Sequence, residues 1–301
     1  SLDTASQWNK VTYSDTIAEY FGGLGNIDLA DYNRDGWLDL YLNGSANSSL
    51  FINNGTTGAL NQSTNLAGGL LTYSNGRWGD VNMDGALDVF IMAVIEGQDI
   101  ILKSLQLNNN GDFSEDPTTI FPELTNGGSA WGDYDNDGDL DVLASDRRSK
   151  TPGILWLENP GTKAMKPDPS LKWNVHRIGA IGKEVMFITL SEENTIYAAV
   201  RPNSIHILGP NGNPRKPWRE EVITYPPDMY GTAKAARAAD LDGDGQVEIA
   251  VSCEAANGVK SGVFYLKQSK GKWVDHDIGG PKGIKYAVSY THLTLPTNRE
   301  V

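Results

Sequence analysis

One nine-residue pattern, rich in aspartate, recurs four times in this chain and constrains its fold more than any other feature. Each copy reads Asp-x-Asp/Asn-x-Asp-Gly-x-x-Asp/Glu and runs directly into a short apolar segment. The copies begin at Asp31, Asp80, Asp133 and Asp240, so successive starts lie 49, 53 and 107 residues apart. A period near 50 residues is typical of arrays in which each repeat is one supersecondary unit that stacks on the next.

The last interval is close to twice the others and predicts a degenerate copy between the third and fourth loops. Aligning residues 196–200 with residues 247–251 places this copy at Thr189, Ser191, Glu193, Asn194 and Tyr197. The apolar strand pattern survives there, whereas most of the carboxylates are replaced. We therefore expect a repeat at this place that binds no metal.

Each period contains segments that have the pattern of four short strands. The strand that enters the acidic loop and the apolar run that leaves it are followed by a Gly/Asn turn and two further runs. The first of these covers residues 49–55, 153–161, 205–209 and 262–266, and the second, which opens with Trp, covers residues 173–178, 218–223 and 273–278. Helical periodicity is nearly absent. Four strands in about 50 residues predict an all-β fold, a β-propeller of four-stranded blades. Residues 8–14 resemble the outer strand and are expected to belong to the closing blade.

The acidic loops are candidate Ca²⁺ sites. Ca²⁺ takes about six to eight oxygen ligands, and a nine-residue loop can supply them from side chains at positions 1, 3, 5 and 9 and a backbone carbonyl at position 7. Gly at position 6 permits the sharp turn. The predicted ligands are Asp31, Asn33, Asp35, Trp37 and Asp39; Asp80, Asn82, Asp84, Ala86 and Asp88; Asp133, Asp135, Asp137, Asp139 and Asp141; and Asp240, Asp242, Asp244, Gln246 and Glu248.

Two other interpretations of these loops are weaker. An EF-hand needs Glu at position 12 between two helices, but position 12 is Leu42, Ile91, Ala144 or Val251, inside apolar runs. A single copy could be a polar turn, but turns do not require oxygen-bearing side chains at fixed spacing in four copies. We predict about four Ca²⁺ ions in structural rather than catalytic roles, because loops that saturate their ion leave no open position for a substrate.

Composition excludes some classes of protein. The net charge is −13, with 38 acidic and 25 basic residues, and no basic stripe is present to bind nucleic acid. No apolar run approaches the roughly 18 residues of a membrane-spanning helix. Cys253 is the single cysteine and lies in an apolar run, so we expect a buried, inert thiol. The chain opens at Ser1 without Met or a signal peptide, which suggests a processed or truncated start.

The loops and their surroundings resemble a known family. The acidic loop entering an apolar strand, with Trp-Gly-Asp before two copies (Trp78-Gly-Asp80 and Trp131-Gly-Asp133), is similar to FG-GAP/VCBS repeats of integrin-α-type propellers and bacterial secreted proteins. The resemblance covers about residues 20–286. It implies a Ca²⁺-binding propeller that is extracellular, periplasmic or on the cell surface. Such propellers serve adhesion, glycan binding and enzyme scaffolding alike, so the resemblance leaves the function open.

The last residues depart from the repeat pattern. A further acidic loop is due near residue 290, and residues 282–286 look like its lead-in, but residues 287–301 form a Thr-rich tail that resembles translated vector sequence. We therefore expect an incomplete propeller over residues 1–286 and a non-native tail over residues 287–301. On this interpretation the chain holds about five and a half blades of seven.

Two classes of function remain open. The first is a secreted or cell-surface module that binds a protein or a glycan, and the second is the propeller scaffold of a polysaccharide lyase or hydrolase. We favour the binding module, because no nucleophile elbow, zinc signature or phosphate loop is present. A cleft with convergent His, Tyr, Arg or Lys would favour the enzyme, and a flat polar face with aromatic residues the binding module. The oligomeric state is left open.

Individual histidines and aromatic residues have two interpretations each. His176 and His276 occupy equivalent outer-strand positions, which favours a structural role in the repeat, and His206 lies in an apolar strand. Three aromatic residues could stack on sugars or could equally pack within the blades. They are Trp37, Tyr225 and Tyr230.

Overall fold

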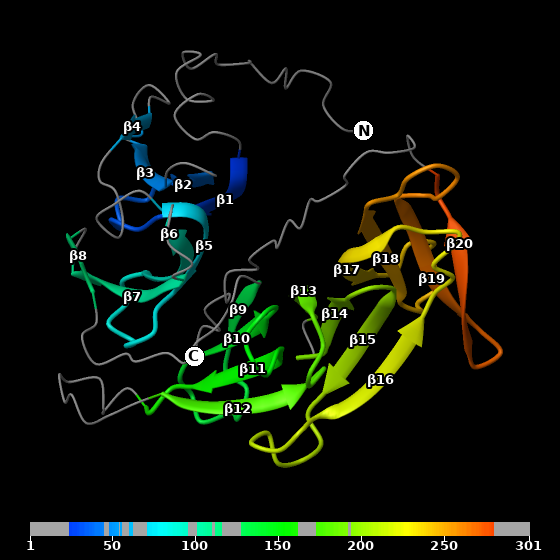
Figure 1. Ribbon diagram of the computed structural model, residues 1–301. Coiled ribbons are helices and arrows are strands. Elements are labelled where there is room, and N and C mark those ends of the chain that lie inside the picture. The colour runs from blue at the N-terminus through cyan, green and yellow to red at the C-terminus, as the bar shows by residue number, and fades with distance from the viewer. Residues whose placement is uncertain are drawn as a thin grey trace.

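The computed structural model describes residues 24–44, 48–53, 55, 60–62, 71–95, 101–109, 112–115, 128–161, 173–191 and 194–279. These residues form strands, turns and loops, and no helix occurs among them. The strands form five antiparallel sheets of four strands each within the described part of the chain (Figure 1). The predicted all-β architecture of four-stranded units is therefore confirmed. No helix in these ranges is long and apolar enough to cross a membrane.

Each sheet is a meander of four strands that are consecutive in the sequence. The first sheet contains β1 (Leu24–Ala30), β2 (Asp39–Gly44), β3 (Ser48–Asn53) and β4 (Leu60–Gln62). The second contains β5 (Leu71–Gly79), β6 (Asp88–Ile95), β7 (Ile101–Asn109) and β8 (Asp112–Glu115). The third contains β9 (Ser129–Gly132), β10 (Asp141–Asp146), β11 (Gly153–Glu158) and β12 (Asn174–Gly179). The fourth contains β13 (Val185–Leu190), β14 (Ile196–Val200), β15 (Ser204–Gly209) and β16 (Arg219–Thr224). The fifth contains β17 (Thr232–Ala239), β18 (Glu248–Glu254), β19 (Val263–Ser269) and β20 (Lys272–Asp277).

The sheets are arranged radially, as blades of a β-propeller. The first strands, β1, β5, β9, β13 and β17, contact one another in chain order. They line the inner side of the arc in Figure 1, whereas the fourth strands lie on its outer side. The runs at residues 173–178, 218–223 and 273–278 form these outer strands β12, β16 and β20, as the sequence predicts.

The core lies between neighbouring sheets because each inner sheet buries both of its faces. In β14 of the fourth sheet, Ile196, Ala198 and Val200 pack toward the third sheet. The alternate residues Tyr197 and Ala199 pack with residues of the fifth sheet. Successive side chains of a strand point to opposite faces, so an apolar run without polar alternation is what a blade between two others requires. Fully burying one such aliphatic side chain contributes about 1.5–3 kcal/mol.

The acidic loops connect the first and second strands of four sheets. The strand ladder pairs Ala30 with Asp39, Gly79 with Asp88, Gly132 with Asp141 and Ala239 with Glu248. Position 9 of each loop is thus the first residue of a second strand, directly opposite the residue that precedes position 1. Because the connection is the same in each sheet, these loops lie at the same edge of every sheet that carries one.

The degenerate copy has kept its strands and shortened its loop. In the fourth sheet Thr189 pairs with Tyr197 and Leu190 with Ile196, so two predicted loop positions are paired in the ladder. The backbone N–H of Ser191 donates to the carbonyl of Thr195 at 2.9 Å, which closes a tight turn. The predicted position Glu193, the strand at residues 8–14 and the segments 282–286 and 287–301 lie outside the described residues.

Candidate metal centre

The first Asp of every loop organises the backbone of its turn. Asp31 Oδ1 accepts a hydrogen bond from the backbone N–H of Asp35 at 3.0 Å, and Asp31 Oδ2 accepts one from Gly36 at 2.9 Å. Both bonds recur at Asp80 and Asp133. The two carboxylate oxygens of each accept hydrogen bonds from the backbone N–H groups of positions 5 and 6 of the same loop at 2.9–3.1 Å. Position 6 has a positive φ in all four loops, +88° at Gly36, which confirms the reason for glycine at this position.

Position 5 caps the second half of the turn. Asp35 Oδ1 accepts from the backbone N–H of Trp37 at 2.9 Å, and the same bond recurs from position 5 to position 7 in the other three loops. Position 4 also has a positive φ, for example +59° at Arg34 and +60° at Asn136. The loops therefore share one backbone conformation, although three of the four position-4 residues carry a side chain.

Position 9 is buried and joins the loop to the third strand of its sheet. Asp141 accepts hydrogen bonds from the backbone N–H of Tyr134 at 3.2 Å and of Asn159 at 2.7 Å. Asp39 and Asp88 accept the two equivalent bonds. Burial raises the pKa of Asp88 and of Asp141 to about 7, against the opposing effect of these hydrogen bonds. A nearby cation would favour the ionised form of both carboxyl groups.

The structure brings the predicted ligands together most clearly in the third and fourth loops. Carboxylate oxygens of Asp133, Asp135 and Asp141 lie within 4.8 Å of one another, and so do those of Asp240, Asp242 and Glu248. In the first two loops position 3 is Asn; Asn33 Oδ1 and Asn82 Oδ1 accept from the N–H of position 5. The third and fourth loops therefore contain carboxylate clusters that could hold a metal ion.

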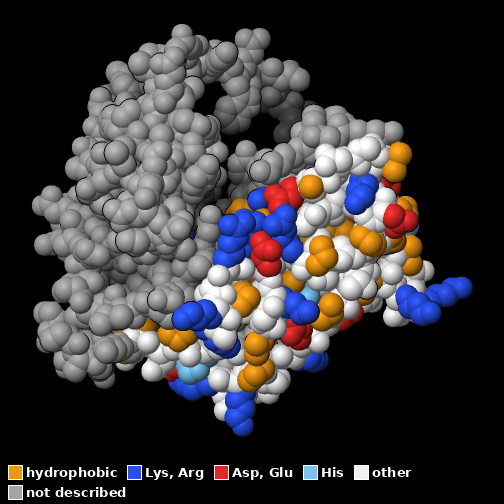
Figure 2. All heavy atoms as spheres, viewed as in Figure 1, with side chains coloured by type: hydrophobic (Ala, Val, Ile, Leu, Met, Phe, Trp, Pro, Cys, Tyr) orange, Lys and Arg blue, Asp and Glu red, His pale blue; other side chains and the backbone are white. Residues whose placement is uncertain are grey.

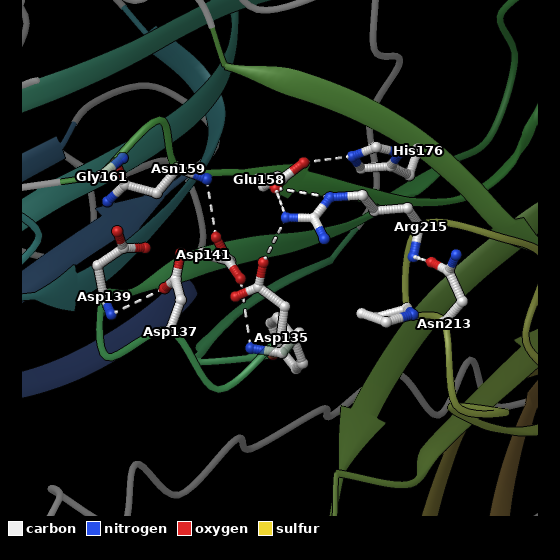
Figure 3. A network of polar contacts seen from close by, with 12 residues as sticks. Asp135, Asp137, Asp139, Asp141, Glu158, Asn159, Gly161, His176, Asn213 and Arg215 are labelled. Carbon is white, nitrogen blue, oxygen red and sulfur yellow. Dashed lines mark hydrogen bonds and ion pairs between the residues drawn. The ribbon is translucent and has the colours of Figure 1, made fainter.

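The third loop passes a specific test of fit to a cation (Figure 3). Asp135 Oδ1 and Asp139 Oδ1 are buried and have no hydrogen-bond partner among the described residues. Burial, together with the charge of Asp137, raises the pKa of Asp139 to about 7. A buried carboxylate oxygen without a donor is costly, and a hard cation would satisfy both oxygens. From the sequence, only the backbone carbonyl of position 7 was expected to be a ligand. The signal for the side chain of Asp139 is that, among the four loops, only the third has an acidic residue at this position.

A buried carboxylate beside the third loop was not singled out from the sequence. Glu158, at the end of β11, is 6% exposed and accepts hydrogen bonds from Arg215 Nε at 2.9 Å and from His176 Nε2 at 2.6 Å (Figure 3). Arg215 also contacts Asp135 Oδ2 at 2.9 Å. The guanidinium comes from the connection between β15 and β16, so it ties the fourth sheet to the loop of the third. These hydrogen bonds outweigh the effect of burial and hold the pKa of Glu158 below its ordinary value.

The histidines have structural environments. His176 lies opposite Trp156 with ring centroids 4.7 Å apart, and His276 lies opposite Tyr265 at 4.8 Å, which confirms their equivalent positions. His206 is buried, as its apolar strand predicts, but it contacts Ser204 Oγ at 3.1 Å and the carboxylate of Glu220.

The three aromatic residues considered for sugar stacking differ. Tyr225 and Tyr230 are 2% and 1% exposed, and their rings pack on Phe264 at centroid distances of 4.7 and 4.0 Å. Packing in the core between the fourth and fifth sheets is therefore the correct interpretation for both. Trp37, at position 7 of the first loop, is 51% exposed and stays available to a ligand.

A chain of ion pairs crosses three sheets. Glu184 joins Arg147 at 2.6 Å to Arg201 at 3.1 Å, and Glu254 joins Arg201 at 2.7 Å to Lys234 at 3.2 Å. Arg147 follows β10, Glu184 precedes β13, and Glu254 ends β18, so these residues lie at the edge opposite the acidic loops. On the face shown in Figure 2, basic and acidic side chains of the described residues are interspersed in the same way.

Comparison with known proteins identifies the repeats. Residues 16–91 match the FG-GAP-like repeat family, and this segment includes the first two acidic loops. Residues 16–91 therefore contain FG-GAP-like repeats, as their motifs predict. No curated protein matches the chain. A solved structure of an Agrocybe aegerita lectin, described as specifically recognising non-reducing terminal N-acetylglucosamine, is similar with 13% sequence identity and a TM-score of 0.48. The likeness covers 86% of this chain and 67% of the lectin chain.

Proposed function

We propose that this chain is part of a calcium-binding β-propeller that acts as a secreted or cell-surface module and binds a protein or a glycan. The observation that carries the metal proposal is the pair of buried oxygens of Asp135 and Asp139 in the third loop, which have no hydrogen-bond partner in the part of the chain that the structure describes. A site of this kind favours a hard cation with oxygen ligands. The FG-GAP repeats at residues 16–91 support the same assignment.

The loop residues have separate tasks in this proposal. Position 1 orders the turn, position 5 holds the backbone of position 7, and position 9 joins the loop to the third strand of the sheet. Bound Ca²⁺ would neutralise the clustered carboxylates and hold the positions together. Because the loops lie at one edge of the sheets, their stabilisation would order one face of the propeller. Loops positioned by a rigid scaffold are common binding surfaces.

A secreted location rests on the chemistry of calcium. Extracellular calcium modules work with dissociation constants of roughly 10⁻⁴–10⁻³ M, and loops that need Ca²⁺ for stability suit compartments rich in it. This location predicts that the protein is stable in millimolar Ca²⁺ and loosened at the submicromolar levels typical of a cytosol.

The experiment is a calorimetric titration of chelator-treated protein with CaCl₂. Wild type is compared with Asp137→Asn and with Asp228→Asn, an exposed control in the turn before Tyr230. Position 5 is Asp in all four loops, and Asn at residue 137 removes this carboxylate but keeps an oxygen that can accept from the backbone N–H of Asp139. We expect Asp137→Asn to bind one ion fewer than wild type and Asp228→Asn to match wild type. Absence of any binding heat, in all three proteins, would overturn the metal proposal.

The ligand is tested with the same samples. Glycan arrays and immobilised polysaccharides are probed in Ca²⁺ and in chelator, and binding is expected only in Ca²⁺. Substitution of the exposed Trp37 by Ala reports whether the loop face contributes to binding. Release of oligosaccharide from a bound polysaccharide would instead favour the scaffold of a degrading enzyme.

A further inference from the structure

The fourth acidic loop contains a cation of its own. Lys267 Nζ contacts Asp242 Oδ2, lies 2.8 Å from Asp244 Oδ2 and lies 3.0 Å from Glu248 Oε1. These carboxylates occupy positions 3, 5 and 9 of the loop, which are the side-chain positions expected to ligate Ca²⁺ beyond position 1. One ammonium group has three N–H donors, so it can serve one acceptor on each of the three residues.

Lys267 reaches this place because of the register of the fifth sheet. Ile249 pairs with Leu266, so the next residue along β19, Lys267, stands beside Glu248 at the start of β18. The same register in the other loop-bearing sheets places Ile52, Leu107 and Glu158 at this position. Among the four loop-bearing sheets, only the fifth has a basic residue at the position opposite position 9 of its loop.

We propose that the Lys267 ammonium replaces Ca²⁺ in the fourth loop, so that this loop is stabilised without metal while the first three loops bind it. An ammonium nitrogen within hydrogen-bonding distance of three ligand carboxylates occupies the place that a metal ion would need. The inference rests on the proposed function, because the expected number of bound ions assumes that the first three loops bind Ca²⁺. It lowers the expected number of ions from about four to three.

The third and fourth loops differ in the way this proposal requires. In the third loop two buried carboxylate oxygens have no hydrogen-bond partner among the described residues. The fourth loop has one such oxygen, Glu248 Oε1, but the ammonium of Lys267 lies 3.0 Å from it. Lys267 Nζ also donates hydrogen bonds to Asp242 Oδ2 and to Asp244 Oδ2 of the fourth loop. The position-9 carboxylate of the fourth loop, Glu248, is 1% exposed, so the neighbouring ammonium balances a buried charge that has little access to water.

Arg215 does not play the same part in the third loop. Its guanidinium contacts Asp135 Oδ2 but directs its other nitrogen contacts to Glu158, outside the loop. Asp133 and Asp137 receive only backbone hydrogen bonds in the described contacts. The guanidinium therefore lies beside the carboxylate cluster, whereas the ammonium of Lys267 lies among the carboxylates of its loop.

The test compares wild type with Lys267→Met, which keeps the length of the side chain and removes its charge. Lys272→Met, at an exposed position in the neighbouring strand β20, is the matched control. Calorimetric titration with CaCl₂ is expected to give three ions for wild type and for Lys272→Met and four for Lys267→Met. Four ions in wild type, or three in Lys267→Met, would overturn the inference while calcium binding itself stands.

A second readout does not depend on calcium. In chelator, loss of the ammonium leaves the carboxylates of the fourth loop to repel one another, so Lys267→Met is expected to melt about 2–4 °C below Lys272→Met. Added CaCl₂ should raise the melting temperature of Lys267→Met and remove this difference, because Ca²⁺ can then bind in the fourth loop. Equal melting temperatures of the two variants in chelator would contradict the role of Lys267. If none of the three proteins binds Ca²⁺ but Lys267→Met still melts below Lys272→Met, the proposed calcium binding is wrong and the stabilising role of Lys267 is supported.

Discussion

Asn108 Nδ2 donates a hydrogen bond of 2.8 Å to the backbone oxygen of Tyr32, which lies 76 residues earlier in the neighbouring sheet. The same amide donates to the carbonyl of Leu87 at 3.1 Å. Asn159 repeats both contacts one sheet later, to Val81 at 3.4 Å and Leu140 at 3.0 Å. An asparagine at the end of the third strand thus fastens the acidic loop of its own sheet to the loop of the preceding one.

Removing this link should destabilise the junction between the first two sheets. Asn108→Ala deletes two donors to backbone carbonyls, and an unsatisfied buried group costs about 1–3 kcal/mol. We expect a loss of that size in the free energy of unfolding, measured by urea denaturation in saturating CaCl₂. Asn53→Ala is the control, because the side chain of Asn53 donates a hydrogen bond within its own sheet, to the carbonyl of Leu38. Equal losses in the two variants would show that the link between sheets adds nothing.

The charge of Asp139 should have opposite effects with and without metal. In chelator Asp139→Asn removes a buried carboxylate whose ionised form is disfavoured by burial and by Asp137, so the melting temperature should rise by about 2–4 °C. In CaCl₂ the variant should lose part of the stabilisation that wild type gains. Thermal melts in both conditions measure this reversal. A change of the same sign in both conditions would argue against a metal ligand at Asp139.

Arg215 should stabilise the junction between the third and fourth sheets. Its removal in Arg215→Ala leaves the buried Glu158 with His176, and we expect a loss of about 1–2 kcal/mol, moderated because Arg215 is half exposed. Arg215→Lys keeps the charge but not the planar fork that binds two acceptors, so it should recover only part of the loss. Urea denaturation of both variants measures the effect, and full recovery by Lys would reduce the contact to simple charge attraction.

The ion-pair chain at the opposite edge should make stability depend on acid pH. Burial raises the pKa of Glu184, but hydrogen bonds from Arg147 and Arg201 outweigh it and hold the pKa below its ordinary value of 4.5. A pKa lowered by folding gives stability that is present above the ordinary pKa and is lost as the pH falls through the lowered one. Wild type should therefore be more stable than Glu184→Gln at pH 6, and the difference should shrink as the pH falls below 4.5 and through the lowered pKa. Urea denaturation across this range measures it, and a constant difference would exclude titration of Glu184 as the cause.

The single thiol should report opening of the fifth sheet. Cys253 is buried in β18, as its apolar run predicts, and burial raises its pKa to about 11. Because the thiolate is the reactive form, native protein should react with a disulfide reagent far more slowly than unfolded protein. Reaction rates in increasing urea should follow unfolding of the fifth sheet, monitored in parallel by fluorescence. Fast reaction of the native protein would mean that this sheet opens easily.

Some features of this protein are determined by short stretches of sequence. The turn conformation of each acidic loop needs only nine residues, because glycine at position 6 and the acceptor at position 1 act locally on the backbone. The strands follow from apolar runs, and the Trp at residues 173, 218 and 273 marks the outer ones. The spacing of the loops then gives the repeated sheet, since every copy must bury the same apolar faces.

Other features were decided only by the tertiary structure. The contacts of Asn108 with Tyr32 and of Arg215 with Glu158 join residues 76 and 57 positions apart in neighbouring sheets. Lys267 enters the fourth loop because the strand register brings β19 beside Glu248. A side chain reaches only a few ångströms, so its partner depends on how strands and sheets are placed against each other. Local patterns fix that a loop gathers carboxylates, and only the packing of the sheets decides which cation lies nearest to them.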